Sequence, residues 1–194
     1  MSPSLSSRDI TLVALFAALT VVFAIVPPIP VPLIPVPVTL QTLGVMLAGL
    51  VLGPRLALLA IGLYLALALV GFPVLPGARS GLAVFAGPTG GFLIGFLPGA
   101  WVAGWMAQRA AQVAGAERSA AKAFWGNLTA AVLGGALVVY LIGVPWLAAV
   151  TGMEISKAIM AVAIFVPGDI VKAVIAALVA TRLAQLMPPA GHRD

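Results

Sequence analysis

Charged side chains are so sparse in this sequence that a soluble fold is excluded. Five acidic and ten basic residues are spread over 194 residues, and 62% of the chain is hydrophobic. Soluble domains carry charge on about a quarter of their residues. We therefore predict an all-α integral membrane protein. The length accommodates roughly six membrane-spanning helices with short loops, so residues 1–194 are expected to form a single membrane domain.

Six apolar segments are predicted to form the transmembrane helices. They cover about residues 10–26, 39–53, 56–71, 88–107, 123–142 and 168–186. The first lacks the small-residue cleavage site of a signal peptide, and its apolar run is longer than such a peptide needs. The second and third are short for a full span, so neighbouring helices are expected to cover them in part. The proline-rich segment 27–37 is predicted to be an extended loop, and segment 154–166 to cover the membrane rather than cross it.

The basic residues predict that the N-terminus and the C-terminus are both cytoplasmic. In that orientation the cytoplasmic basic residues are Arg8, Arg55, Arg109, Arg118, Lys122, Arg182 and Arg193. Arg79 and Lys157 then lie outside, and Lys172 lies within a span. This seven-to-two excess follows the positive-inside rule.

Several classes of function are excluded by residues that the sequence lacks. There is no cysteine, and the single histidine is His192, so neither a Ser-His site nor a multi-histidine site can form within the membrane. The phosphate-binding motif G-x-x-x-x-G-K-[ST] is also missing, so ATP energy would have to come from a partner. Basic residues are scattered singly, which does not favour nucleic-acid binding. We expect no enzymatic activity.

Asp169 and Lys172, in the segment "VPGDIVK", are the strongest candidates for a ligand site. Charges within a span are costly and are functional candidates by default. The predicted topology places Asp169 in the first turn of the last helix, where free N–H groups and the helix dipole favour a carboxylate. The alternative is a purely structural ion pair, in which Asp169 caps the helix and Lys172 pairs with it.

Three helix starts and an outer loop converge at the same membrane depth in this topology. The loop carries Arg79, and the fourth helix begins with Thr89, Gly90 and Gly91, where a ligand could reach unshielded backbone N–H groups. Gly91 also belongs to a small-x-x-x-small stripe that continues through residues 95, 99, 103 and 107. Such a stripe admits a neighbouring helix, so ligand contact and helix packing are both open for it.

Two further polar residues have open roles. Gln41, in the first turn of the second helix, can bind a ligand, cap the helix or pack. Tyr140 can flank the pocket or act as an interfacial aromatic residue. The combined inventory of both charges, an amide and bare backbone donors suits a small amphipathic solute with a carboxylate and a polar ring. It does not suit an ion channel, because no ring of like charges is present.

The segments "VPVTLQTLGVMLAGLVLGPR", "GPTGGFLIGF" and "VPGDIVK", in this order and spacing, carry a family resemblance. The chain resembles the biotin-specific S components of energy-coupling-factor (ECF) transporters, the BioY family. The resemblance implies a six-helix protein of the bacterial inner membrane that captures biotin from outside. It also implies a transmembrane coupling subunit and a pair of ABC-type ATPases as partners. Biotin is then the cargo, and no cofactor is expected.

The same resemblance assigns roles to matching residues. Asp169 and Lys172 would bind the polar groups of biotin, and Arg79 and the "PTGG" turn would complete the pocket. One position departs from the family pattern, because Leu93 stands where some relatives carry an arginine. We expect Arg79 to supply that guanidinium from the loop.

Ala14 and Ala18 form a small-x-x-x-small pair in the otherwise bulky first helix. Such a pair lets another helix approach closely. It can pack within the bundle, or, as the resemblance implies, dock the coupling subunit. Two alternative functions stay open: an S component for a different vitamin, and a self-sufficient secondary transporter of a small carboxylate solute. For the latter we find no inverted repeat of broken helices.

Overall fold

Helices account for all the regular elements in the computed structural model, which describes residues 5–32, 34–115 and 119–186. The elements are α1 (Ser7–Ile25), α2 (Gln41–Leu52), α3 (Pro54–Val70), α4 (Leu82–Ala86), α5 (Gly90–Ala114), α6 (Ala120–Ala130), α7 (Val139–Thr151), α8 (Ile155–Val162) and α9 (Val166–Leu186). A π-helix, η2 (Ala131–Val138), joins α6 to α7, and a 3-10 turn, η3 (Ala163–Phe165), joins α8 to α9. The predicted all-α fold class is confirmed.

Four continuous helices among the described residues are long and apolar enough to cross a membrane. They are Ser7–Ile25, Gly90–Ala114, Ala120–Thr151 and Ile155–Leu186. The apolar helices α2 and α3 are shorter. The chain is therefore a membrane protein by the length and composition of its helices.

The largest differences from the predicted bounds are helices that continue further than expected. The helix predicted over 123–142 covers Ala120–Thr151, with Pro145 inside it. A proline costs one backbone hydrogen bond, whereas ending the helix in an apolar environment leaves several groups without partners. The helix predicted over 88–107 continues to Ala114 because its last residues are mostly alanine, glutamine and arginine, which favour helix. Segment 154–166, predicted to cover the membrane, contains α8 and η3, which continue directly into α9.

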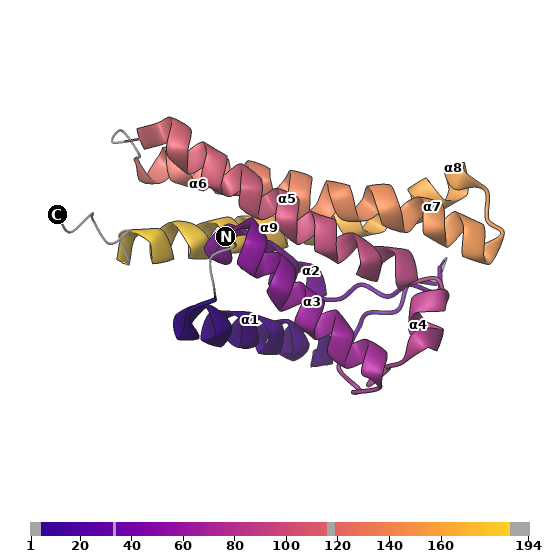
Figure 1. The fold of residues 1–194 in the computed structure, drawn as a ribbon. Coiled ribbons are helices and arrows are strands. Elements are labelled where there is room, and N and C mark those ends of the chain that lie inside the picture. Colours follow the sequence, from indigo (N-terminus) through magenta and orange to yellow (C-terminus); the bar gives the residue numbers. More distant parts are fainter. Residues whose placement is uncertain (1–4, 33, 116–118, 187–194) are drawn as a thin grey trace.

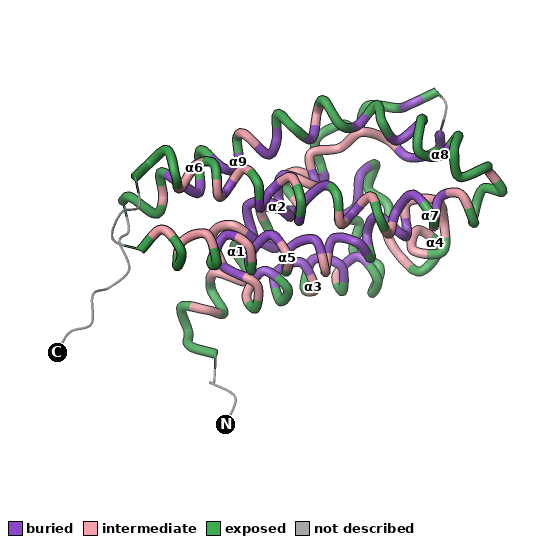
Figure 2. The backbone as a smooth tube through the Cα atoms, turned by 90° about the horizontal axis from the view of Figure 1, so that it is seen from above, coloured by how far each residue is buried: buried purple, intermediate pink, exposed green. Residues whose placement is uncertain are grey.

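The long helices lie roughly parallel, and α2 occupies the centre of the bundle. Figure 1 shows α5 beside the continuous α6–α7 helix, with the start of α1 and the end of α9 at one end and α4 and α8 at the other. Helix α2 packs against α1, α3, α5, α9 and η2, and most of its residues are buried (Figure 2). Neighbours therefore cover this short helix, as predicted.

Small residues allow α5 to approach α7 and η2 closely. A Cβ added at Gly95 would meet the backbone of Val139, and one at Gly99 would meet the carbonyl of Gly134 at 2.9 Å. A Cβ at Gly134 would lie 2.6 Å from the Cα of Ala103. The stripe beyond Gly91 is therefore a helix-packing surface, and it fixes the position of α7 against the start of α5.

The proline-rich segment after α1 is a loop, as predicted, and it folds back on itself. The backbone groups of Ile29 and Val38 exchange two hydrogen bonds of 2.9 Å. Val31, Ile34 and Val36 are buried, so the loop packs onto the bundle. This arrangement brings residues 36–38 to the wall of a cavity.

Candidate ligand-binding site

A cavity lies where α2, α5, α7 and α9 meet the loop before α4. Its lining is mostly apolar and aromatic, with a few polar side chains, which is the usual composition of a small-molecule site. The structure brings together five residues of the predicted site, which all line it: Gln41, Arg79, Thr89, Asp169 and Lys172. Gly90 and Gly91 do not line it.

Asp169 accepts hydrogen bonds from three side chains that belong to three helices. Lys172 Nζ donates to Oδ1 at 2.7 Å, and Thr42 Oγ1 donates to the same oxygen at 2.9 Å. The hydroxyl of Tyr140 donates to Oδ2. Only 4% of Asp169 is exposed, so these bonds replace most of the water that an ionised carboxylate needs. The carboxylate is therefore fixed in position before any ligand arrives.

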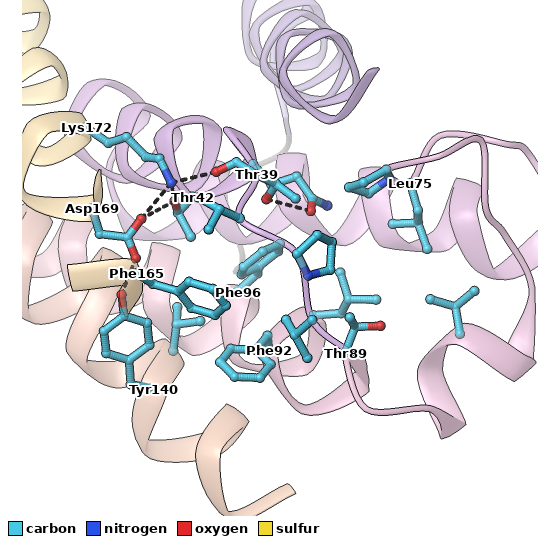
Figure 3. A pocket seen from close by; sticks show the side chains of 18 of the residues that line it. Thr39, Thr42, Leu75, Thr89, Phe92, Phe96, Tyr140, Phe165, Asp169 and Lys172 are labelled. Carbon is cyan, nitrogen blue, oxygen red and sulfur yellow. Dashed lines mark hydrogen bonds and ion pairs between the residues drawn. The ribbon is translucent and has the colours of Figure 1, made fainter. Parts of the chain in front are cut away.

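Lys172 is similarly constrained. Its ammonium donates to the carbonyl oxygen of Thr39 at 2.6 Å and to Thr42 Oγ1 at 3.1 Å, in addition to Asp169. Only 6% of the residue is exposed. We call these five residues, Thr39, Thr42, Tyr140, Asp169 and Lys172, the polar cluster (Figure 3). Within it one negative and one positive charge cancel, so the cluster presents donors and acceptors with no net charge.

Thr39 and Thr42 are not among the site residues that the sequence predicts, and the sequence leaves the role of Tyr140 open. Thr42 could have been found as a second polar residue in the first turn of an otherwise apolar helix. The position of Tyr140 depends on how α7 packs against α9, which no local pattern reveals. In the structure Tyr140 lines the cavity and bonds to Asp169, so it flanks the pocket.

Three phenylalanine rings separate the polar cluster from the opposite end of the cavity. Phe92 and Phe96 come from α5, and Phe165 comes from the turn before α9. The rings of Phe92 and Phe165 meet edge to face with centroids 6.5 Å apart. Figure 3 shows these rings between Asp169 and Leu75. The middle of the cavity is therefore apolar.

Arg79 belongs to a tight turn at that opposite end. The backbone of Leu75 pairs with that of Arg79 through bonds of 3.1 and 3.3 Å, and positive φ angles at Gly77 and Ala78 allow the chain to reverse. Arg79 Nε donates to the carbonyl of Pro76 at 3.0 Å. We call residues 74–79 the arginine turn. Among the described residues no carboxylate lies within ion-pair distance of Arg79, so this end of the cavity carries a net positive charge.

Gln41 and Thr89 line the cavity without capping their helices. The amide of Gln41 donates to the hydroxyl of Tyr64 at 2.6 Å and accepts from Thr39 Oγ1 at 3.1 Å. Thr89 immediately precedes α5, and its side chain forms no capping bond there. The indole of Trp146 donates to the carbonyl of Gly87 at 2.9 Å and so ties this turn to α7.

Gly90 and Gly91 are buried in protein contacts. A Cβ at Gly90 would collide with the carbonyl of Phe85, and one at Gly91 would collide with the side chain of Trp146. These contacts explain why both residues are glycine without invoking a ligand. The ligand contact that the sequence predicts for them stays a prediction.

The residues that line the cavity suit the binding of a small molecule. Within the described ranges, no group of three or more His, Cys, Asp or Glu residues could hold a metal ion. The polar cluster without net charge, the aromatic middle and the positively charged arginine turn suit an elongated ligand with a neutral polar head, an apolar body and an anionic tail.

Comparison with known sequences gives a consistent result over almost the whole chain. Residues 1–189 match the model of the BioY family. A Rhizobium etli protein named biotin transporter BioY is 45% identical over 90% of this chain and 91% of its own length. A Rhodobacter capsulatus protein of the same name is 43% identical over 94% of this chain and 96% of its own.

A solved structure has the same fold. It is described as the S component for biotin from an ECF-type ABC transporter, and it superimposes with a TM-score of 0.85 at 30% identity. The match covers 94% of this chain and 95% of that chain. The helix arrangement and the sequence comparisons therefore agree.

Proposed function

The chain belongs to the BioY family, and we propose on this basis that it is the biotin-binding S component of an ECF-type ABC transporter. The observation that carries the proposal is the charge pattern of the cavity: a neutral polar cluster at one end, three phenylalanine rings, and an arginine at the other end. From one end to the other, biotin has an uncharged ureido ring, an apolar body and a carboxylate, which matches the order of these three parts of the cavity.

The ureido ring fits the polar cluster. Its two N–H groups need acceptors, and its carbonyl needs a donor. Asp169 keeps acceptor capacity after its three bonds, and Lys172 can redirect one N–H from Thr42 or Thr39 to the ligand. A carboxylate would fit this end less well, because the carboxylate of Asp169 already neutralises Lys172.

The carboxylate of biotin fits the arginine turn. Arg79 lines the cavity and has one N–H bound to Pro76, so its remaining guanidinium donors can form charge-assisted bonds. Thr89 and Gln41 line the same cavity and add neutral polar contacts.

The membrane topology extends this proposal. Six spans, α1, α2, α3, α5, α6–α7 and α9, form a single domain in the bacterial inner membrane, with both termini in the cytoplasm and the cavity facing outward. The excess of basic residues on one side of the predicted spans supports this orientation. Biotin is the cargo and not a cofactor.

The partners in transport are the coupling transmembrane subunit and its ABC-type ATPases. Ala14 and Ala18 are both exposed on α1, whereas Ala17 on the same helix is buried. An exposed small-x-x-x-small pair supports docking of a helix from outside the bundle over packing within it.

Binding of biotin and of biotin amide to the purified protein in detergent tests the proposal. Biotin should bind more tightly by about 1.5–3 kcal/mol, the range for hydrogen bonds to charged groups. Arg79→Gln should remove that preference while leaving the amide affinity unchanged. Absence of biotin binding by the wild-type protein would favour an S component for another vitamin.

Uptake into proteoliposomes distinguishes an S component from a self-sufficient secondary transporter. The S component should accumulate biotin only when the coupling subunit, the ATPases and ATP are present. Accumulation by the chain alone would instead identify a self-sufficient secondary transporter.

A further inference from the structure

Tyr64 is a buried polar residue that the binding site does not use directly. It lies in the middle of α3, is 0% exposed and does not line the cavity. Burial of a tyrosine hydroxyl requires hydrogen-bond partners. Its partners therefore indicate what the hydroxyl does.

The hydroxyl of Tyr64 joins two segments that flank the cavity. It accepts a hydrogen bond of 2.6 Å from the amide of Gln41, at the start of α2. It donates a bond of 3.3 Å to the carbonyl of Val74, the first residue of the arginine turn. Since Leu75 and Arg79 are paired through their backbones, a contact at Val74 restrains the position of Arg79.

The other side of Gln41 continues this connection to the polar cluster. Gln41 Oε1 accepts from Thr39 Oγ1 at 3.1 Å, and the carbonyl of Thr39 accepts from Lys172 at 2.6 Å. A continuous series of hydrogen bonds thus runs from Lys172 through Thr39, Gln41 and Tyr64 to the arginine turn. It links the two ends of the cavity along its wall.

The geometry points to Tyr64 as a positioning residue that sets the distance between Arg79 and the polar cluster, and hence the affinity for the carboxylate of the ligand. This inference rests on the proposed function, because it assumes that biotin lies with its carboxylate at Arg79. Tyr64 acts through the arginine turn and touches no ligand. The loop that contains the arginine turn is also anchored on its other side, where Gly81 N–H donates to the carbonyl of Ala68 at 2.7 Å. This bond lets the loop remain folded without the hydroxyl of Tyr64.

Tyr64→Phe tests the inference, with Tyr140→Phe as a matched control that loses the same hydroxyl at the polar cluster. Tyr64→Phe should weaken biotin binding about tenfold and change biotin amide binding less than about twofold. Tyr140→Phe should weaken both ligands by the same factor, because its hydroxyl bonds to Asp169. Equal weakening of both ligands by Tyr64→Phe, or no weakening, would overturn the inference.

Two further measurements separate positioning from a general loss of stability. In an Arg79→Gln background, Tyr64→Phe should weaken biotin binding no further, whereas an additive loss would contradict the inference. Hydrogen exchange of the ligand-free protein should be faster over residues 74–81 in Tyr64→Phe and unchanged there in Tyr140→Phe. Unchanged exchange in Tyr64→Phe would also contradict it. Failure of the wild-type protein to bind biotin would instead refute the proposed function.

Discussion

Helices α1 and α5 carry the same small-x-x-x-small pattern but differ in what occupies it. The stripe on α5 is buried, and the backbones of η2 and α7 fill it at Gly95 and Gly99. Ala14 and Ala18 on α1 are exposed, and no helix of the described chain covers them. One pattern therefore assembles the bundle and its cavity, and the other is free to contact a partner. A single sequence motif does not distinguish the two.

The largest effect is expected where the α5 stripe meets η2. Gly134→Ala would force a methyl group against the backbone of Ala103, which cannot move aside as a side chain can. We expect destabilisation of about 3 kcal/mol or more, with loss of folded protein, because overpacking forces backbone shifts. The midpoint of thermal unfolding in detergent measures it. Leu133→Ala is the control, since Leu133 is the exposed neighbour and should change the midpoint far less.

The α1 pair should give the opposite result. Ala14→Leu with Ala18→Leu leaves the bundle and cavity intact, so biotin binding to the isolated subunit should stay within about twofold, while ATP-dependent uptake and co-purification with the coupling subunit are lost. Leu15→Ala, at an exposed position between them, should retain uptake. Loss of binding in the double variant would mean that the pair packs internally. Normal uptake would mean that the pair does not dock the partner.

Asp169→Asn should weaken biotin binding and leave the contact with the coupling subunit intact, which is the reverse of the effect expected for the α1 double variant. It keeps the shape of the side chain but removes the charge that accepts bonds from Lys172, Thr42 and Tyr140. Biotin binding should weaken by about 1.5–3 kcal/mol, with co-purification unchanged. Isothermal titration provides the affinity. A lower folding yield at unchanged affinity would instead support the structural ion pair.

The smallest effect concerns a glycine that no neighbour requires. A Cβ at Gly62 on α3 would meet only Leu97 Cδ2, at an ordinary contact distance of 3.9 Å. Gly62→Ala should therefore stabilise the protein by about 0.5–1 kcal/mol, because alanine favours helix. A raised midpoint of thermal unfolding would support this prediction. A lowered midpoint would contradict it and would mean that α3 packs against α5 as closely at Gly62 as α7 does at Gly95.

The fold was largely predictable because hydropathy is local. Scarce charge and apolar runs located the segments that form α1, α2, α3, α5, α6–α7 and α9. The ends of two helices were predicted too early, because Pro145 and the alanine-rich end of α5 interrupt the apolar pattern without ending the helix. Helix α4 lies in a predicted loop and is only five residues long.

The site was predictable only in part. Asp169 and Lys172 were predicted because charges within apolar helices are costly. Gln41 was predicted from its place in the first turn of a helix, and Arg79 from its place in the predicted outer loop. Thr39 contributes a backbone carbonyl, and Tyr64 acts from a helix that does not reach the cavity. A backbone carbonyl has no sequence signature, and the role of a buried hydroxyl depends on distant partners.

The sequence by itself determined that this chain lies in a membrane, which segments form apolar helices and which charges it buries, because these follow from composition along the chain. Only the tertiary structure decided which small residues pack and which are exposed. It also decided that Gly90 and Gly91 pack against Phe85 and Trp146 rather than line the cavity. The physical reason is that a helix presents every face to its surroundings, and only the position of its neighbours determines which face meets protein, ligand or lipid.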